Sequence, residues 1–139
     1  MADYAGDVSA TDAWQAIRDD ADALLIDVRT QAEWAFVGLP DLAAAGKQPL
    51  LVQWQVYPSM QLNPQFVQQV ADAGAAPGKK LYFICRSGAR SRNAAIAMTQ
   101  AGYAHCYNVA GGFEGGHDGA RHRGTSEGWK ADGLPWIQD

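Results

Sequence analysis

The chain has few cysteines, with two among its 139 residues. Two cysteines allow one disulfide at most, and a chain of this length can build a core without such a bridge. A reducing compartment and a working thiol are therefore the better interpretation, and we expect a cytoplasmic protein.

Positive charge and long apolar runs are also scarce. Lys and Arg number 11 against 15 Asp and Glu, and the net charge of −4 argues against a general nucleic-acid binder. No apolar stretch approaches the length of a membrane span, and the first residues do not resemble a secretory signal. The glycine-rich dinucleotide fingerprint and the phosphate-binding lysine loop are both missing. We therefore expect no nucleic-acid and no membrane partner.

The composition otherwise describes a soluble globular chain, with 47% apolar and 19% charged residues. Its length predicts a single domain over residues 1–139. Residues 111–139 form a glycine-rich loop and a C-terminal tail in this interpretation. Trp129, Pro135 and Trp136 would pin the tail to the body as aromatic anchors.

Apolar runs alternate with segments of helical periodicity along the chain. A very short first strand is expected to include Val8. Four longer strands are expected over residues 24–28, 50–54, 81–84 and 105–110. Three helices are expected to start at Ser9, at Thr30 in a capping box with Glu33, and at Asn63 before Pro64. Residues 40–49 are expected to form a loop. This alternation predicts an α/β fold with a mainly parallel sheet and helices on both faces.

One stretch, residues 79–102, carries the strongest chemical signal. A strand ends on Cys85, a short loop with two arginines follows, and a helix then runs to a stop near Gly102. Such a loop turns backbone N–H groups inward beside the positive end of the helix dipole. Both features favour negative charge on a group placed there, a cysteine thiolate included.

Functional groups gather at the carboxyl edge of a parallel sheet, and other residues are expected there with Cys85. They include Asp27 and Arg29, which follow the strand over residues 24–28. We expect these two to form an ion pair or to brace the cysteine loop, rather than to take part in the chemistry.

Four segments together resemble the single-domain rhodaneses of the thiosulfate sulfurtransferase type: LIDVRTQAEW, FICRSGARSRNAAIAMTQAGY, YNVAGGFEG and GWKADGLPW. The resemblance implies a three-layer rhodanese-like fold with a five-stranded, mainly parallel sheet flanked by helices. It also implies a persulfide carried on Cys85 within a cradle made by Arg86, Ser87, Gly88, Ala89, Arg90 and Ser91. Two departures concern the far side of the site: Leu39 follows Gly38 where many members have histidine, and residues 40–49 lack the usual Pro-Gly-Ala run.

The expected activity is sulfur transfer of the thiosulfate:cyanide type. The Cys85 thiolate attacks the sulfane sulfur of a small anionic donor such as thiosulfate, and a thiol, cyanide or a protein acceptor then removes that sulfur. Arg86 and Arg90 would supply positive charge for the donor. Ser87 and Ser91 would bond the persulfide or cap the helix, and capping is favoured for Ser91. No cofactor and no metal are expected.

Two alternatives remain. Cysteine-based phosphatases of related architecture, and arsenate reductase-like enzymes, would use the same kind of loop for an oxyanion. The phosphatase loop has its arginine six positions after the cysteine, where this chain has Ser91; Arg90 comes one position early, so the ring is smaller. The other alternative is a carrier module that holds sulfur for a partner protein.

The remaining candidates have ordinary explanations. Cys106 starts a strand, away from the catalytic edge, and core packing is favoured over a resolving thiol. His105, His117 and His122 lack a compact metal-ligand spacing. Arg121, His122 and Arg123 form either a solvated loop or a basic rim. Nothing in the sequence forces an oligomer, so we expect a monomer or a weak dimer.

Overall fold

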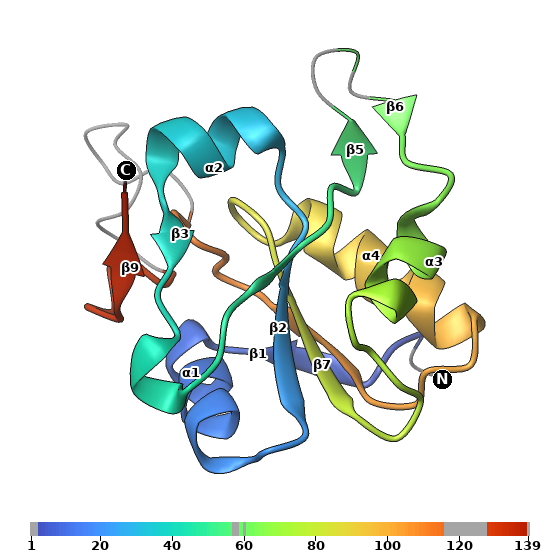
Figure 1. Ribbon diagram of the computed structural model, residues 1–139, viewed down its shortest axis with the longest axis horizontal. Coiled ribbons are helices and arrows are strands. Elements are labelled where there is room, and N and C mark those ends of the chain that lie inside the picture. Colours follow the sequence, from blue (N-terminus) through green and yellow to red (C-terminus); the bar gives the residue numbers. More distant parts are fainter. Residues whose placement is uncertain (1–2, 57–58, 60, 116–127, 139) are drawn as a thin grey trace.

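The computed structural model describes residues 3–56, 59, 61–115 and 128–138. Five parallel strands form its central sheet, in the order β1-β8-β7-β2-β4 (Figure 1). Their bounds are Gly6–Val8 for β1, Ala23–Asp27 for β2, Leu50–Leu51 for β4, Lys80–Ile84 for β7 and Cys106–Val109 for β8. The predicted fold class, a mainly parallel five-stranded sheet with helices on both faces, is confirmed.

Helices cover both faces of this sheet. On one face α1 (Ala10–Asp19) packs with Trp129 and Phe113 against β2, β7 and β8. On the other face α3 (Phe66–Asp72) and α4 (Ala89–Gln100) enclose a second core. The helix α2 (Gln31–Val37) follows β2 at the carboxyl edge, and the short 3-10 helix η1 covers Ala43–Ala45.

Two small antiparallel sheets complete the fold. In one, β3 (Leu39–Pro40) pairs with β9 (Trp136–Ile137), and in the other β5 (Gln55–Val56) pairs with β6 (Gln61–Leu62). Figure 1 shows the β5–β6 hairpin and α2 at the same end of the central sheet. That end is the carboxyl edge, where the strand before Cys85 also ends.

The central strand β7 explains why Cys85 has a fixed position. Leu81, Phe83 and Ile84 are fully buried, because β7 lies between β2 and β8 with helices above and below. Both faces of such a strand must be apolar, as the run LYFI is. The strand therefore delivers the residue that follows it, Cys85, to the middle of the carboxyl edge.

The predicted caps are present at two helix starts. The Ser9 hydroxyl oxygen accepts the backbone N–H of Asp12 at 3.0 Å, and Thr30 and Glu33 form the reciprocal capping box. The prediction that a helix starts at Asn63 is wrong: α3 begins at Phe66. The Asn63 side chain instead accepts the backbone N–H of Gln65 at 3.0 Å, which stabilises a turn before the helix.

Other predicted bounds differ locally from the structure. The strand expected over residues 50–54 is only Leu50–Leu51, although the backbone N–H groups of Val52 and Trp54 still donate to the carbonyl oxygens of Asp27 and Val28 before the β5–β6 hairpin. The loop expected over residues 40–49 contains η1 and the end of β3.

Of the expected aromatic anchors in the C-terminal tail, Trp129 is buried, whereas Trp136 is 40% exposed and meets Phe113 edge to face. Trp129 is fully buried and its indole N–H donates to the Pro135 carbonyl oxygen at 2.6 Å. Arg121, His122, Arg123 and His117 lie outside the described residues. The assignment of residues 1–139 to a single domain stays a prediction. No helix in the described part of the chain is long and apolar enough to cross a membrane.

Candidate active site

Cys85 lies at the base of a tight loop between β7 and α4, and its residue is only 1% exposed. The Gly88 backbone N–H donates to the Cys85 Sγ at 3.1 Å, and the Ser91 hydroxyl oxygen lies 3.2 Å from the same sulfur. The helix α4 begins one residue after Gly88, so its positive end lies beside the sulfur. The loop is thus built to hold a sulfur atom that carries negative charge.

Residues 113–115 bind two backbone carbonyl oxygens of this loop. The backbone N–H of Phe113 donates to the Cys85 carbonyl oxygen at 2.8 Å, and those of Glu114 and Gly115 donate to the Arg86 carbonyl oxygen at 3.0 Å. In a planar trans peptide the N–H points opposite to the carbonyl. Because the Cys85 and Arg86 carbonyls point toward residues 113–115, the N–H groups of Arg86 and Ser87 point in the opposite direction.

Two glycines permit the segment after β8 to approach the cysteine loop closely. Gly88 has a φ of +113°, and a Cβ there would overlap the carbonyl oxygen of Ala110. Gly112 has a φ of +64°, and a Cβ there would lie 2.5 Å from the Arg86 carbonyl oxygen and 2.7 Å from that of Cys85. Both positions need glycine, for backbone conformation and for space.

The predicted cradle residues differ in how they face solvent. Gly88 and Ser91 are buried, Ser87 and Arg90 are half-buried, and Arg86 and Ala89 are exposed. The prediction that Ser91 caps the helix is wrong. Gly88 is the N-cap of α4, and Ser91 lies inside the helix with its hydroxyl between Cys85 and Asn108.

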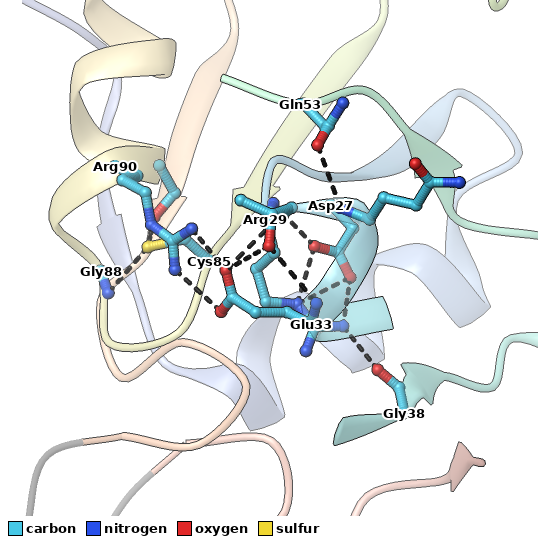
Figure 2. Close-up of polar contacts among 11 residues, drawn as sticks. Asp27, Arg29, Glu33, Gly38, Gln53, Cys85, Gly88 and Arg90 are labelled. Carbon is cyan, nitrogen blue, oxygen red and sulfur yellow. Dashed lines mark hydrogen bonds and ion pairs between the residues drawn. The ribbon is translucent and has the colours of Figure 1, made fainter. Parts of the chain in front are cut away.

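Arg90 is held by Glu33 of α2 in a bidentate ion pair, with Nη1–Oε1 at 2.6 Å and Nη2–Oε2 at 3.0 Å (Figure 2). Burial by itself would raise the pKa of Glu33, but the hydrogen bonds and charge of Arg90 outweigh it and hold this pKa below its ordinary value. Likewise, burial would lower the pKa of Arg90, but Glu33 raises it overall. The guanidinium fork of Arg90 is therefore already occupied by a carboxylate.

Asp27 and Arg29 form the expected ion pair, and both side chains are fully buried. The Arg29 Nη2 lies 2.7 Å from Asp27 Oδ2 and also donates to the Gly38 carbonyl oxygen at 2.7 Å. The guanidinium carbon lies 4.3 Å from the centre of the Phe113 ring. Arg29 thus ties the end of β2 to the segment that clamps the cysteine loop. Their supporting role in the site stays a prediction.

Cys106 packs in the core, as expected. It is fully buried and pairs with Leu81 at the start of β7, whereas Cys85 follows the end of that strand. Burial raises the pKa of the Cys106 thiol, which keeps it protonated and unreactive. Among the described residues, no group of three or more His, Cys, Asp or Glu side chains could hold a metal ion.

Sequence reasoning missed two residues of the site. Glu33 was explained by its capping box alone, yet it also fixes Arg90 from 57 positions away. Asn108 of β8 was treated as part of a strand, yet its side chain contacts Ser91 at 2.6 Å. A polar side chain inside an otherwise apolar strand was the available signal for Asn108.

Comparison with known proteins gives the family. The family model of the STR4 middle domain matches residues 5–139. The chain belongs to this rhodanese-like family. The rhodanese-like resemblance is thus confirmed, while its assignment to the thiosulfate type stays a prediction.

Several relatives of this rhodanese-like chain are known. An uncharacterised protein of Rickettsia rickettsii is 36% identical over 129 residues, which is 93% of this chain and 94% of the relative. A sulfurtransferase of Allochromatium vinosum is 30% identical over 99 residues, which is 71% of this chain and 76% of the relative. The chain is therefore related to a sulfurtransferase over most of its length.

Solved structures agree on the fold. The crystal structure of Rv0390 from M. tuberculosis has a TM-score of 0.88 at 42% identity, covering 98% of this chain and 99% of the other. The polysulfide-sulfur transferase homodimer of Wolinella succinogenes has a TM-score of 0.67 at 23% identity, covering 99% of this chain and 80% of the other. The second likeness shows the fold alone.

The clamp on the cysteine loop predicts a matched pair of glycine variants. Gly112→Ala and Gly133→Ala both place alanine at a positive φ, +64° and +73°, but only the Gly112 site is crowded. We expect Gly133→Ala to cost about 1 kcal/mol of unfolding free energy and Gly112→Ala about 2 kcal/mol more, since backbone atoms of the loop must move. Urea unfolding measures both. Equal costs would contradict the clamp.

The Glu33–Arg90 pair predicts a pH-dependent stability. The pKa of Glu33 is depressed in the folded protein, so the pair stabilises fully above the ordinary glutamate pKa and loses this effect as pH falls through the folded value. We expect Glu33→Gln to destabilise by about 1–3 kcal/mol at pH 7, and by progressively less as pH falls below the ordinary glutamate pKa.

The control for this prediction is Asp19→Asn, which breaks the exposed Arg18–Asp19 pair. It should leave stability at pH 7 nearly unchanged, since exposed pairs contribute little. Denaturant unfolding at several pH values decides the outcome. If the loss of unfolding free energy in Glu33→Gln does not shrink as pH falls, the stabilisation does not come from the charged Glu33–Arg90 pair.

Proposed function

We propose that this protein is a sulfurtransferase that carries a sulfane sulfur as a persulfide on Cys85. The observation that supports the proposal most is the environment of the Cys85 sulfur. It accepts the Gly88 N–H at 3.1 Å, beside the positive end of a twelve-residue helix. Donors fixed in advance stabilise developing negative charge without reorganisation, and a persulfide carries that charge on its outer sulfur.

The proposed reaction has two displacement steps. The Cys85 thiolate attacks the outer sulfur of a donor such as thiosulfate, forming a bond between the two sulfurs, and sulfite leaves with the electron pair of the broken bond. A thiolate or cyanide then attacks the outer sulfur of the persulfide. The Cys85 thiolate leaves and is restored. Electrons balance in each step, so no organic cofactor or metal is needed.

The charges around the cradle indicate which side chain can bind an anionic sulfur donor. Asp27 neutralises Arg29, and Glu33 neutralises Arg90. Arg86 is exposed, and no ion pair among the described residues includes it. We propose that Arg86 receives the anionic part of the donor, while the helix end and loop amides hold the transferred sulfur.

The same geometry disfavours the phosphatase alternative. A phosphatase loop needs a free arginine fork for the equatorial oxygens of phosphate. Here the Arg90 fork is bound on both nitrogens by Glu33, and the ring between Cys85 and Arg90 is one residue shorter. A sulfur atom suits this space better than a tetrahedral phosphate. A cytoplasmic location and a monomer or weak dimer accompany the proposal.

Intact-mass measurement after thiosulfate treatment tests the proposal. We expect a gain of one sulfur atom, about 32 Da, which cyanide removes. Cys85→Ala should lose the gain entirely. Cys106→Ser, the matched cysteine control, should keep it, because Cys106 lies at the other end of the sheet. No gain in the unmodified protein, together with hydrolysis of an aryl phosphate, would overturn the proposal.

A further inference from the structure

A line of polar contacts leads from the Cys85 sulfur to the surface. The Ser91 Oγ lies 3.2 Å from Cys85 Sγ and 2.6 Å from Asn108 Oδ1. The Asn108 amide nitrogen donates to Asp7 Oδ1 at 3.0 Å, and the Tyr4 hydroxyl donates to the same oxygen at 2.7 Å. Ser91 and Asn108 are buried, whereas Asp7 is exposed. The contacts thus join a surface carboxylate to the buried nucleophile.

Donor and acceptor chemistry fixes the direction of each bond. The Asp7 carboxylate only accepts, so Asn108 must turn its NH₂ group toward Asp7 and its carbonyl oxygen toward Ser91. That carbonyl oxygen also only accepts. The 2.6 Å contact therefore uses the single hydroxyl proton of Ser91. Ser91 is left presenting a lone pair, and not a proton, to the Cys85 sulfur.

The Ser91 contact by itself therefore suits a thiol and offers no proton to a thiolate, although the Gly88 N–H still donates to the same sulfur. A Cys85 thiol can donate its proton to the Ser91 oxygen, but a thiolate would face a lone pair at 3.2 Å. To stabilise the anion, the hydroxyl must turn away from Asn108, which Asp7 holds in place. We propose that Asp7 and Asn108 are positioning residues that direct the Ser91 hydroxyl proton away from the sulfur and so restrain the reactivity of Cys85. Because an amide does not pass a proton along, the effect is one of orientation.

Other charged groups near the cradle do not explain such a link. Arg90 from α4 is paired with Glu33 from α2, and Asp27 is paired with Arg29 at the end of β2. No hydrogen bond or ion pair among the described residues joins any of these four side chains to Asp7 or Asn108. Removing the Asp7 carboxylate can therefore affect the reactivity of Cys85 in two ways: through the Asn108 amide and the Ser91 hydroxyl, or through the loss of its charge alone. The two effects can be separated by experiment.

The test is the rate constant for alkylation of Cys85 by iodoacetamide at pH 7, with peptide mass mapping to count Cys106 separately. Asp7→Ala frees the Asn108 amide to turn and the Ser91 proton to reach the sulfur. We expect alkylation to become several-fold to about tenfold faster, the scale of the net contribution of one ordinary hydrogen bond. Asp7 is exposed, so its variant should fold.

Two controls separate the routes. In a Ser91→Ala background, Asp7→Ala should leave the alkylation rate unchanged, because no hydroxyl remains to redirect. Asp12→Asn removes a nearby surface charge that does not contact Asn108, and it should not accelerate alkylation. An unchanged rate in Asp7→Ala, or the same acceleration with and without Ser91, would overturn the proposal.

The proposal concerns the nucleophile of the proposed function and deepens it, yet alkylation requires no sulfur donor. If persulfide loading fails while the Asp7 and Ser91 variants behave as expected, the sulfurtransferase proposal falls and the restraint on Cys85 stands. If loading succeeds and the alkylation pattern is absent, the restraint alone falls.

Discussion

The site depends on two peptide carbonyls that face away from the sulfur. Those of Cys85 and Arg86 are bound by the backbone N–H groups of residues 113–115, which come from the turn after β8. Without these bonds the carbonyl dipoles could turn inward, and the loop would repel an anion instead of stabilising it. Gly112 allows the two segments to approach this closely. The chemistry of the loop therefore rests on a segment 28 to 29 positions later in the chain.

Buried charge around the cradle is compensated in pairs. Asp27 and Arg29 are fully buried together, and Glu33 and Arg90 are mostly buried together. Unpaired charges at these depths would be costly, so each pair must stay intact for the carboxyl edge to keep its shape. The Gly88 N–H and the positive end of α4 also contribute to the field at the Cys85 sulfur. Such a field favours a small anionic group over a highly charged oxyanion.

The sequence was informative wherever local rules decide structure. The apolar run of β7, the Ser9 and Thr30 caps and the position of Cys85 between a strand and a helix all follow from neighbouring residues. It failed where a partner distant in sequence decides. Glu33 satisfies a local cap and also reaches Arg90, and Ser91 bonds Asn108 of another strand instead of capping α4. Asn63 resembles an N-cap in the sequence, but it lies three residues before α3 and closes a turn there.

The central claim is that the Cys85 loop holds one transferred sulfur atom. A crystal structure of the protein after exposure to a sulfane-sulfur donor tests it most directly. We predict additional density about 2.0 Å from the Cys85 Sγ, a normal S–S bond length, inside the loop and with Arg90 still paired to Glu33. Sulfur bound to Cys106, or an oxyanion seated in the loop with Arg90 released from Glu33, would contradict the account.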